Sequence, residues 1–113
     1  NLAALYHSQG KYSMAEDNYQ RSLDIKLSLY GEDHLETAVN YHNLAMLYSA
    51  QRQYPRAEIL YKRTLEVREN EYGKLHPELV PVLENYALML KKANRPLEAT
   101  SIETRLRNIK ATS

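Results

Sequence analysis

The chain has 113 residues and a formal net charge of +1, with 43% hydrophobic and 26% charged residues, values that are ordinary for one soluble folded domain. It contains no cysteine, which excludes a disulfide framework, a thiolate nucleophile and a thiolate metal site, and which fits a reducing compartment. No apolar run approaches the length of a membrane span and no signal peptide is visible, so we expect a cytoplasmic protein.

Glycines and prolines mark the ends of six expected helices. Gly31 and Gly73 follow helical patterns, as expected for left-handed helix C-termini, and Pro96 stands at a helix start. Pro81 lies one turn inside its helix, which predicts a kink or a delayed start. The expected helices run from Asn1 to Gln9, Ser13 to Tyr30, Leu35 to Gln51, Pro55 to Tyr72, Pro77 to Ala93 and Pro96 to Lys110.

The hexapeptide at the start of the chain returns twice. Asn-Leu-Ala-Ala-Leu-Tyr at residues 1–6 recurs at 43–48 and, in altered form, at 85–90, each time at an offset of 42 residues. A fixed period of this size is the signature of a solenoid. We therefore expect a single domain of repeat units 1–42, 43–84 and 85–113.

The residues that recur are mostly small or aromatic and lie at helical spacing. Ala15, Tyr19 and Leu23 form one such stripe, which returns as Ala57, Tyr61 and Leu65. Each unit is thus predicted to be an antiparallel helix pair whose remaining apolar face needs a neighbouring pair to cover it. The same pattern assigns most of the ten tyrosines to core packing rather than to stacking on nucleic acid.

The two ends of the array differ from its middle. Glu103 and Arg107 stand where the second unit has Tyr61 and Leu65, which predicts a polar capping helix and the natural end of the array. At the other end the chain begins without a methionine and in mid-motif. This start indicates a fragment whose first half unit leaves apolar surface of its neighbour uncovered.

Charged residues four positions apart predict ion pairs along single helices. The pairs in the favourable order are Asp17 with Arg21, Glu58 with Lys62 and Glu103 with Arg107. The segment from Lys91 onward carries a net charge of +4. We interpret these cations as a solvated end cap, since basic surfaces that bind nucleic acid are usually denser and mixed with stacking groups.

The chain resembles the 42-residue tetratricopeptide repeat of the kinesin light chain type. The resemblance is carried by Leu2, Ala3, Tyr6, Gly10, Tyr12, Ala15 and Tyr19, and by the linker Tyr30-Gly31-Glu32-Asp33-His34. It covers the whole chain, although Asn94-Arg95-Pro96 replaces Gln-Gly-Lys-Tyr in the last turn. The resemblance implies an all-α right-handed superhelical solenoid of about two and a half repeats with a C-terminal capping helix.

No catalytic constellation is visible, and we expect no enzymatic activity, no cofactor and no metal site. There is no Gly-rich phosphate loop, no His-Glu-x-x-His and no nucleophile elbow. His34 and His76 occupy equivalent linker positions near helix starts, which predicts that they cap or fasten a turn. His7 and His42 have no further ligands at a metal-binding spacing.

What remains is a surface for a peptide. In a superhelix of helix pairs, the first helix of each pair lines the concave side. The residues predicted to face that groove are Asn1, Ala4, His7, Ser8, Val39, His42, Asn43, Met46, Ser49, Glu84, Asn85, Leu88, Lys91 and Lys92. Related arrays use groove asparagines and basic residues to hold peptides. We expect a peptide gripped by amides, Met46 and Leu88, with its acidic residues near Lys92.

Two alternatives stay open at this point. The ladder of Asn1, Asn43 and Asn85 could pair with a peptide backbone, or each amide could tie neighbouring repeats together. The chain as a whole is predicted to be a protein-interaction module, with protein or peptide partners and neither nucleic acid nor membrane. The alternative function is a self-assembly or intramolecular regulatory segment of a larger protein, for example a homodimer through the open N-terminal face.

Overall fold

The computed structural model describes residues 11–112 and places them almost entirely in helices. In chain order these are α2 (Tyr12–Tyr30), α3 (Leu35–Ala50), α4 (Tyr54–Tyr72), the short 3-10 helix η1 (Pro77–Leu79), α5 (Val80–Lys92) and α6 (Pro96–Thr112). Every boundary except the start of α5 lies within two residues of its predicted position. The helix expected at Asn1 to Gln9 lies outside the described residues.

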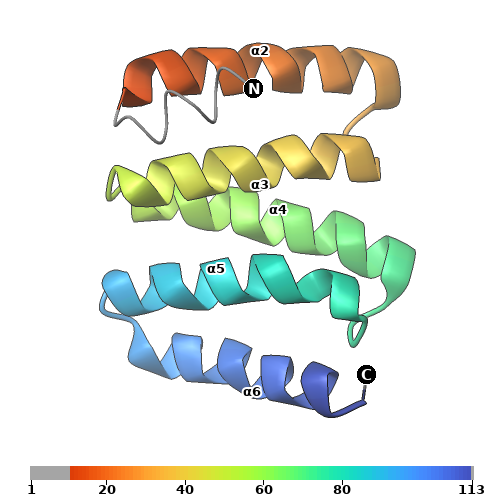
Figure 1. The fold of residues 1–113 in the computed structure, drawn as a ribbon, viewed down its shortest axis with the longest axis vertical. Helices are drawn as coiled ribbons and strands as arrows, with labels where there is room; N and C mark the ends of the chain where they lie inside the picture. Colours follow the sequence, from red (N-terminus) through yellow and green to blue (C-terminus); the bar gives the residue numbers. More distant parts are fainter. Residues whose placement is uncertain (1–10, 113) are drawn as a thin grey trace.

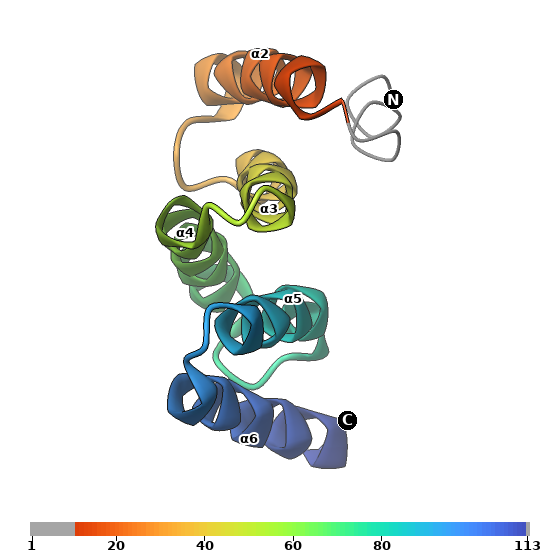
Figure 2. The same cartoon turned by 90° about the vertical axis from the view of Figure 1, so that its left-hand side faces the viewer.

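The helices stack in one direction, each antiparallel to the next (Figure 1). When the molecule is turned, α3 and α5 lie on one side of the stack, α4 lies on the other, and α6 runs beneath α5 (Figure 2). The predicted arrangement of antiparallel helix pairs in an all-α fold is therefore confirmed. It places the first helices of successive units next to each other on one surface.

The start of α5 differs from its predicted position: the α-helix begins at Val80 and not at Pro77. His76 and the following 3-10 turn precede α5, which begins at Val80 with Pro81 in its first turn. A proline is tolerated there because the first helical N–H groups have no intrahelical partner. Of the two predicted effects, the proline thus delays the α-helix.

Gly31 and Gly73 adopt positive φ angles of 84° and 90°, but their ψ angles lie near 180°. They therefore occupy the region that is essentially restricted to glycine rather than the predicted left-handed helical region. The left-handed helical positions are Arg52 and Asn94, each with φ of 61°. Both are the counterparts of Gly10 one and two units further on.

The linkers after α2 and α4 are built in the same way. His34 accepts a hydrogen bond at Nδ1 from the Glu36 N–H at 3.0 Å, and His76 does the same for the Glu78 N–H. Each imidazole stacks on the tyrosine that ends the preceding helix, Tyr30 or Tyr72 respectively. The prediction that the two linker histidines cap a turn is therefore confirmed.

The core runs continuously through the stack. One cluster joins α2 to α3 around Ala15, Tyr19 and Leu44, and a second joins α3 to α6 around Tyr61 and Leu83. Tyr48 and Leu60 pack against both clusters. Because neighbouring units share these residues, burying the apolar stripe of one unit depends on the presence of the next.

Polar contacts also cross the unit boundary. Tyr48 donates to the Glu16 carboxylate at 2.8 Å, and Tyr86 donates to the carboxylate of Glu58, the counterpart of Glu16, at the same distance. Tyr61 and Tyr86 stack with ring centroids 5.5 Å apart. Burial raises the pKa of Tyr61 to about 12, so its phenol remains a neutral packing group.

The predicted pairs along single helices hold in one case of three. Arg21 pairs with Asp17 at 3.2 Å. Glu58 instead forms its ion pair with Arg95 at 2.8 Å, and Glu103 forms its ion pair with Lys91 at 2.6 Å. Both predictions were wrong because a cation from another segment, Arg95 of the turn before α6 or Lys91 of α5, pairs with the carboxylate in place of the cation four residues along.

Candidate peptide-binding face

The predicted groove residues of α3 and α5 lie on one surface, which we call the α3–α5 face. Its members are Val39, His42, Asn43, Met46 and Ser49 of α3 and Glu84, Asn85, Leu88, Lys91 and Lys92 of α5. His42, Asn43, Ser49 and Asn85 are half-buried, and the other six are exposed. The remaining predicted groove residues, Asn1, Ala4, His7 and Ser8, lie outside the described part of the chain.

Three large apolar side chains of this face are open to solvent. Val39 is 46% exposed, Met46 is 37% exposed and Leu88 is 51% exposed. Val39 and Met46 lie two turns apart on α3, and Leu88 is the counterpart of Met46 in the next unit. Exposed apolar side chains that gather on one surface among polar residues indicate an interaction site.

Asn85 is already engaged within the protein. Its Nδ2 lies 2.9 Å from His42 Nε2 and 3.6 Å from the Met46 sulfur, both on α3. Asn85 therefore follows the second interpretation of the asparagine ladder, in which the amide ties neighbouring units together. This contact could not be read from the ladder itself, because His42 has no counterpart histidine in the other units.

His42 is the acceptor in this contact. Burial, with a smaller contribution from the positive charge of Arg68, lowers the pKa of His42 to about 4. The imidazole is therefore neutral at physiological pH, and the Asn85 amide N–H group donates to its unprotonated Nε2. The ring also meets Tyr61 edge to face at a centroid distance of 6.0 Å.

Asn43 differs from Asn85. Its half-buried side chain makes no hydrogen bond to any of the residues at positions 11–112. An amide in this position offers both donors and an acceptor to a ligand. The alternative in which a ladder asparagine pairs with a peptide backbone therefore stays a prediction for Asn43.

The basic end of the face contains one residue, Arg52, that is absent from the predicted groove set. Lys92, Arg52, Ser49 and Tyr54 line a shallow hollow beside the turn between α3 and α4. Neither cation forms an ion pair with another residue in the described range, whereas Lys91 is paired with Glu103. Arg52 and Lys92 are far apart in the sequence, and their spacing does not predict that they lie together. Only the stacking of the units shows that Arg52 belongs to this end of the face.

Two other classes of site find no support in the described residues. Across positions 11–112, no three His, Cys, Asp or Glu side chains gather in a way that could hold a metal ion. None of the helices that the structure describes is long and apolar enough to cross a bilayer.

Comparison with known proteins agrees with this architecture. The family profile described as "Tetratricopeptide repeat" matches residues 1–70. The chain belongs to the tetratricopeptide repeat family. Domains of this family typically mediate protein–protein interaction. A search of curated proteins finds no match.

Among solved structures, the chain is similar to the crystal structure of BtubC (BKLC), a bacterial kinesin light chain from P. vanneervenii. The match has 27% sequence identity and a TM-score of 0.88. It covers 99% of this chain and 45% of that chain, so the repeats seen here span less than half of that protein. The expected resemblance to the kinesin light chain type is confirmed.

Proposed function

We propose that this tetratricopeptide repeat domain is a protein-interaction module that holds an extended or helical peptide of a partner along the α3–α5 face. The observation that carries the proposal is the exposure of Val39, Met46 and Leu88 beside Asn43, whose amide makes no hydrogen bond within residues 11–112. The apolar side chains offer contacts to the side chains of a peptide, and the Asn43 amide offers hydrogen bonds to the peptide's main chain. Grooves that recognise peptides use this combination.

The cations at the end of the face set the direction of the peptide. Arg52 and Lys92 lie together, and neither forms an ion pair within the described residues. Glu84, near the other end of α5, forms an ion pair with Lys110 and adds no unpaired cation there. We therefore infer a peptide with apolar residues in its middle and acidic residues at the end that reaches Arg52 and Lys92.

A peptide-library selection on the chain tests this proposal. The decisive variant is Val39→Glu with Asn43→Glu, which places two charges on the α3–α5 face and leaves the contact between Asn85 and His42 intact. The matched control is Ile25→Glu with Ile59→Glu, at exposed positions on α2 and α4. Circular dichroism shows whether each variant is folded.

The wild type and the control should enrich the same motif, and the face variant should lose it. Enrichment of strongly basic motifs by the wild type would contradict the proposed direction. Equal enrichment by the face variant and the control would show that the peptide binds elsewhere.

A further inference from the structure

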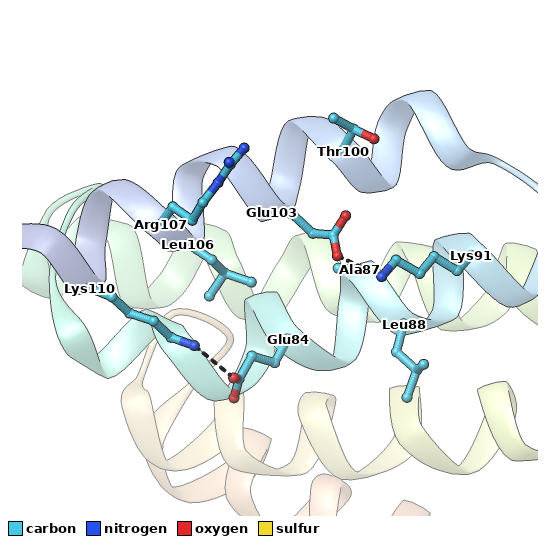
Figure 3. Close-up of a pocket in the computed structure, with 9 residues that line it drawn as sticks. All are labelled: Glu84, Ala87, Leu88, Lys91, Thr100, Glu103, Leu106, Arg107 and Lys110. Atoms are coloured by element: carbon cyan, nitrogen blue, oxygen red, sulfur yellow. Dashed lines mark hydrogen bonds and ion pairs between the residues drawn. The ribbon is translucent and has the colours of Figure 1, made fainter.

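A groove between α5 and α6 lies at the C-terminal end of the stack. Glu84, Leu88 and Lys91 of α5 line it together with Glu103, Leu106 and Lys110 of α6 (Figure 3). Leu106 points into the space between the two helices, and ion pairs bridge the helices on either side of it (Figure 3). No described element covers this groove.

The repeat shows what such a groove normally holds. In the second unit, α5 rests on the equivalent surface: Asn85 contacts His42 and Met46, and Tyr86 contacts Glu58 and Tyr61. Their counterparts 42 residues on are Glu84, Leu88, Thr100 and Glu103, and all four line the groove between α5 and α6. The groove is thus the third unit's counterpart of the surface on which the next helix of the stack packs.

The side chains of this surface are more highly charged than those of its counterpart in the second unit. Glu103 and Arg107 replace the buried Tyr61 and Leu65 of the second unit, and Glu84 replaces His42. An apolar helix laid on this surface would take these charges out of water without giving them new partners, which is unfavourable. An occupant that fits must bring charges of its own in a matching order.

The charges alternate across and along the groove. At one end Lys91 of α5 pairs with Glu103 of α6 at 2.6 Å, and at the other end Glu84 of α5 pairs with Lys110 of α6 at 3.2 Å. Glu84 and Lys91 are two turns apart on one helix, a separation of roughly 10 Å. Each helix therefore carries an acid at one end of the groove and a base at the other.

Such a pattern is complementary to itself. When two copies face each other about a two-fold axis that lies in the contact plane and runs along or across the groove, Glu84 and Glu103 of one copy each meet Lys91 or Lys110 of the other. Leu88, which is 51% exposed, then forms an apolar centre above the largely buried Ala87 and Leu106, within a charged rim, the usual anatomy of a non-obligate interface.

We propose that a second copy of this chain packs on the α5–α6 groove and forms a two-fold symmetric dimer. This interface lies at the opposite end of the stack from the N-terminal face considered in the sequence analysis. The proposal rests on a different observation from peptide binding, although Glu84, Leu88 and Lys91 belong to both the groove and the α3–α5 face.

Sedimentation velocity on two charge-reversal variants tests the dimer. The first variant, Glu84→Lys with Glu103→Lys, makes the groove wholly basic. The second, Lys91→Glu with Lys110→Glu, leaves Arg107 as its one remaining base. The four side chains are between 40% and 57% exposed, and exposed ion pairs contribute little to stability, so both variants should fold. Asp24→Lys with Lys62→Glu is the control away from the groove.

The wild type and the control should dimerise with increasing concentration, and salt should weaken the dimer. Each reversed variant alone should lose association by a factor on the order of a hundred or more, and mixing the two should restore it as a heterodimer. A wild type that stays monomeric overturns the proposal. So does a reversed variant that dimerises as the wild type does, or a mixture that forms no heterodimer. If either variant proves unfolded, wild-type association that is insensitive to salt contradicts the interface.

Discussion

Asn85 Nδ2 lies 2.9 Å from His42 Nε2, which joins α5 to α3, the first helices of successive helix pairs. The contact needs a neutral imidazole, since a protonated ring would present a donor to the amide N–H group. Burial maintains this state by lowering the pKa of His42 to about 4.

The pH dependence of stability follows from this pKa. The histidine in the unfolded chain takes up its proton near pH 6.5, whereas the folded protein takes it up only near pH 4. The contribution of neutral His42 to the free energy of unfolding is therefore fully present above pH 6.5. It falls as the pH drops from 6.5 to 4, at a rate of at most ~1.4 kcal/mol per pH unit. Urea unfolding across this range measures the slope.

The control for the pH prediction is His42→Gln, whose amide can still accept a hydrogen bond from Asn85 but does not titrate. This variant should have a shallower slope between pH 6.5 and 4 than the wild type. Parallel curves for the two proteins would show that His42 titrates normally in the folded state.

Arg52 adopts a left-handed backbone conformation that costs a non-glycine residue free energy. Arg52→Gly should therefore raise the free energy of unfolding by about 0.5–1 kcal/mol. The same change removes a cation from the proposed peptide-binding face, so it should weaken the binding of a peptide with acidic residues at that end. Unfolding by urea and titration by calorimetry check the two effects.

Asn94→Gly is the matched control for this prediction, because Asn94 has the same φ but asparagine tolerates this conformation well. It should change stability little and leave peptide affinity unchanged. A destabilised Arg52→Gly variant would mean that the side chain of Arg52 contributes more to the fold than its backbone costs.

Glu58 joins three elements through its carboxylate. Arg95 donates to both oxygens at 3.0 and 2.8 Å, and Tyr86 donates to one of them at 2.8 Å. The Arg95 guanidinium holds the pKa of Glu58 below its ordinary value. Glu58→Gln should lower the free energy of unfolding by about 1–2 kcal/mol, because the charge-assisted bonds are lost. Thermal unfolding measures the loss.

Glu16 is the built-in control, since this counterpart accepts from Tyr48 without an equivalent of Arg95 in the next turn. Glu16→Gln should cost clearly less than Glu58→Gln. Equal costs would assign the stabilisation to the tyrosine and not to the arginine.

His34 caps α3 with a side-chain acceptor, which satisfies one of the unpaired N–H groups at the helix start. His34→Ala should destabilise the protein by about 1 kcal/mol, and His34→Asn should retain most of the stability because asparagine also caps well. Chemical denaturation of the two variants, with the His76 pair as a repeat, measures the difference. If Ala and Asn proved equivalent at both positions, the stacking on Tyr30 and Tyr72 would be the dominant role of the ring.

Local features were predictable from the sequence, and long-range pairings were not. Pro96 marked a helix start and the 42-residue period placed the core, because both act within a turn or recur at each unit. The partner of Glu58 was assigned to Lys62 because helical spacing reveals only neighbours on the same helix. Arg95 lies 37 residues away and is brought near by the turn before α6.

The candidate face illustrates the same limit. Its apolar members followed from their spacing, and Met46 and Leu88 are exposed as a groove position requires. Three equivalent asparagines could not reveal that Asn85 is bound to His42 while Asn43 is not, because that difference depends on the side chain opposite each amide. The approach of Arg52 to Lys92 likewise depends on how the units stack.

The most direct test of peptide binding on the α3–α5 face is an amide NMR titration of the chain with a selected peptide. Binding on this face should produce shift changes that cluster around Val39 to Met46 and Leu88 to Lys92, with a further change at Arg52 when the acidic end is present. Changes confined to α2, α4 or the outer surface of α6 would contradict it.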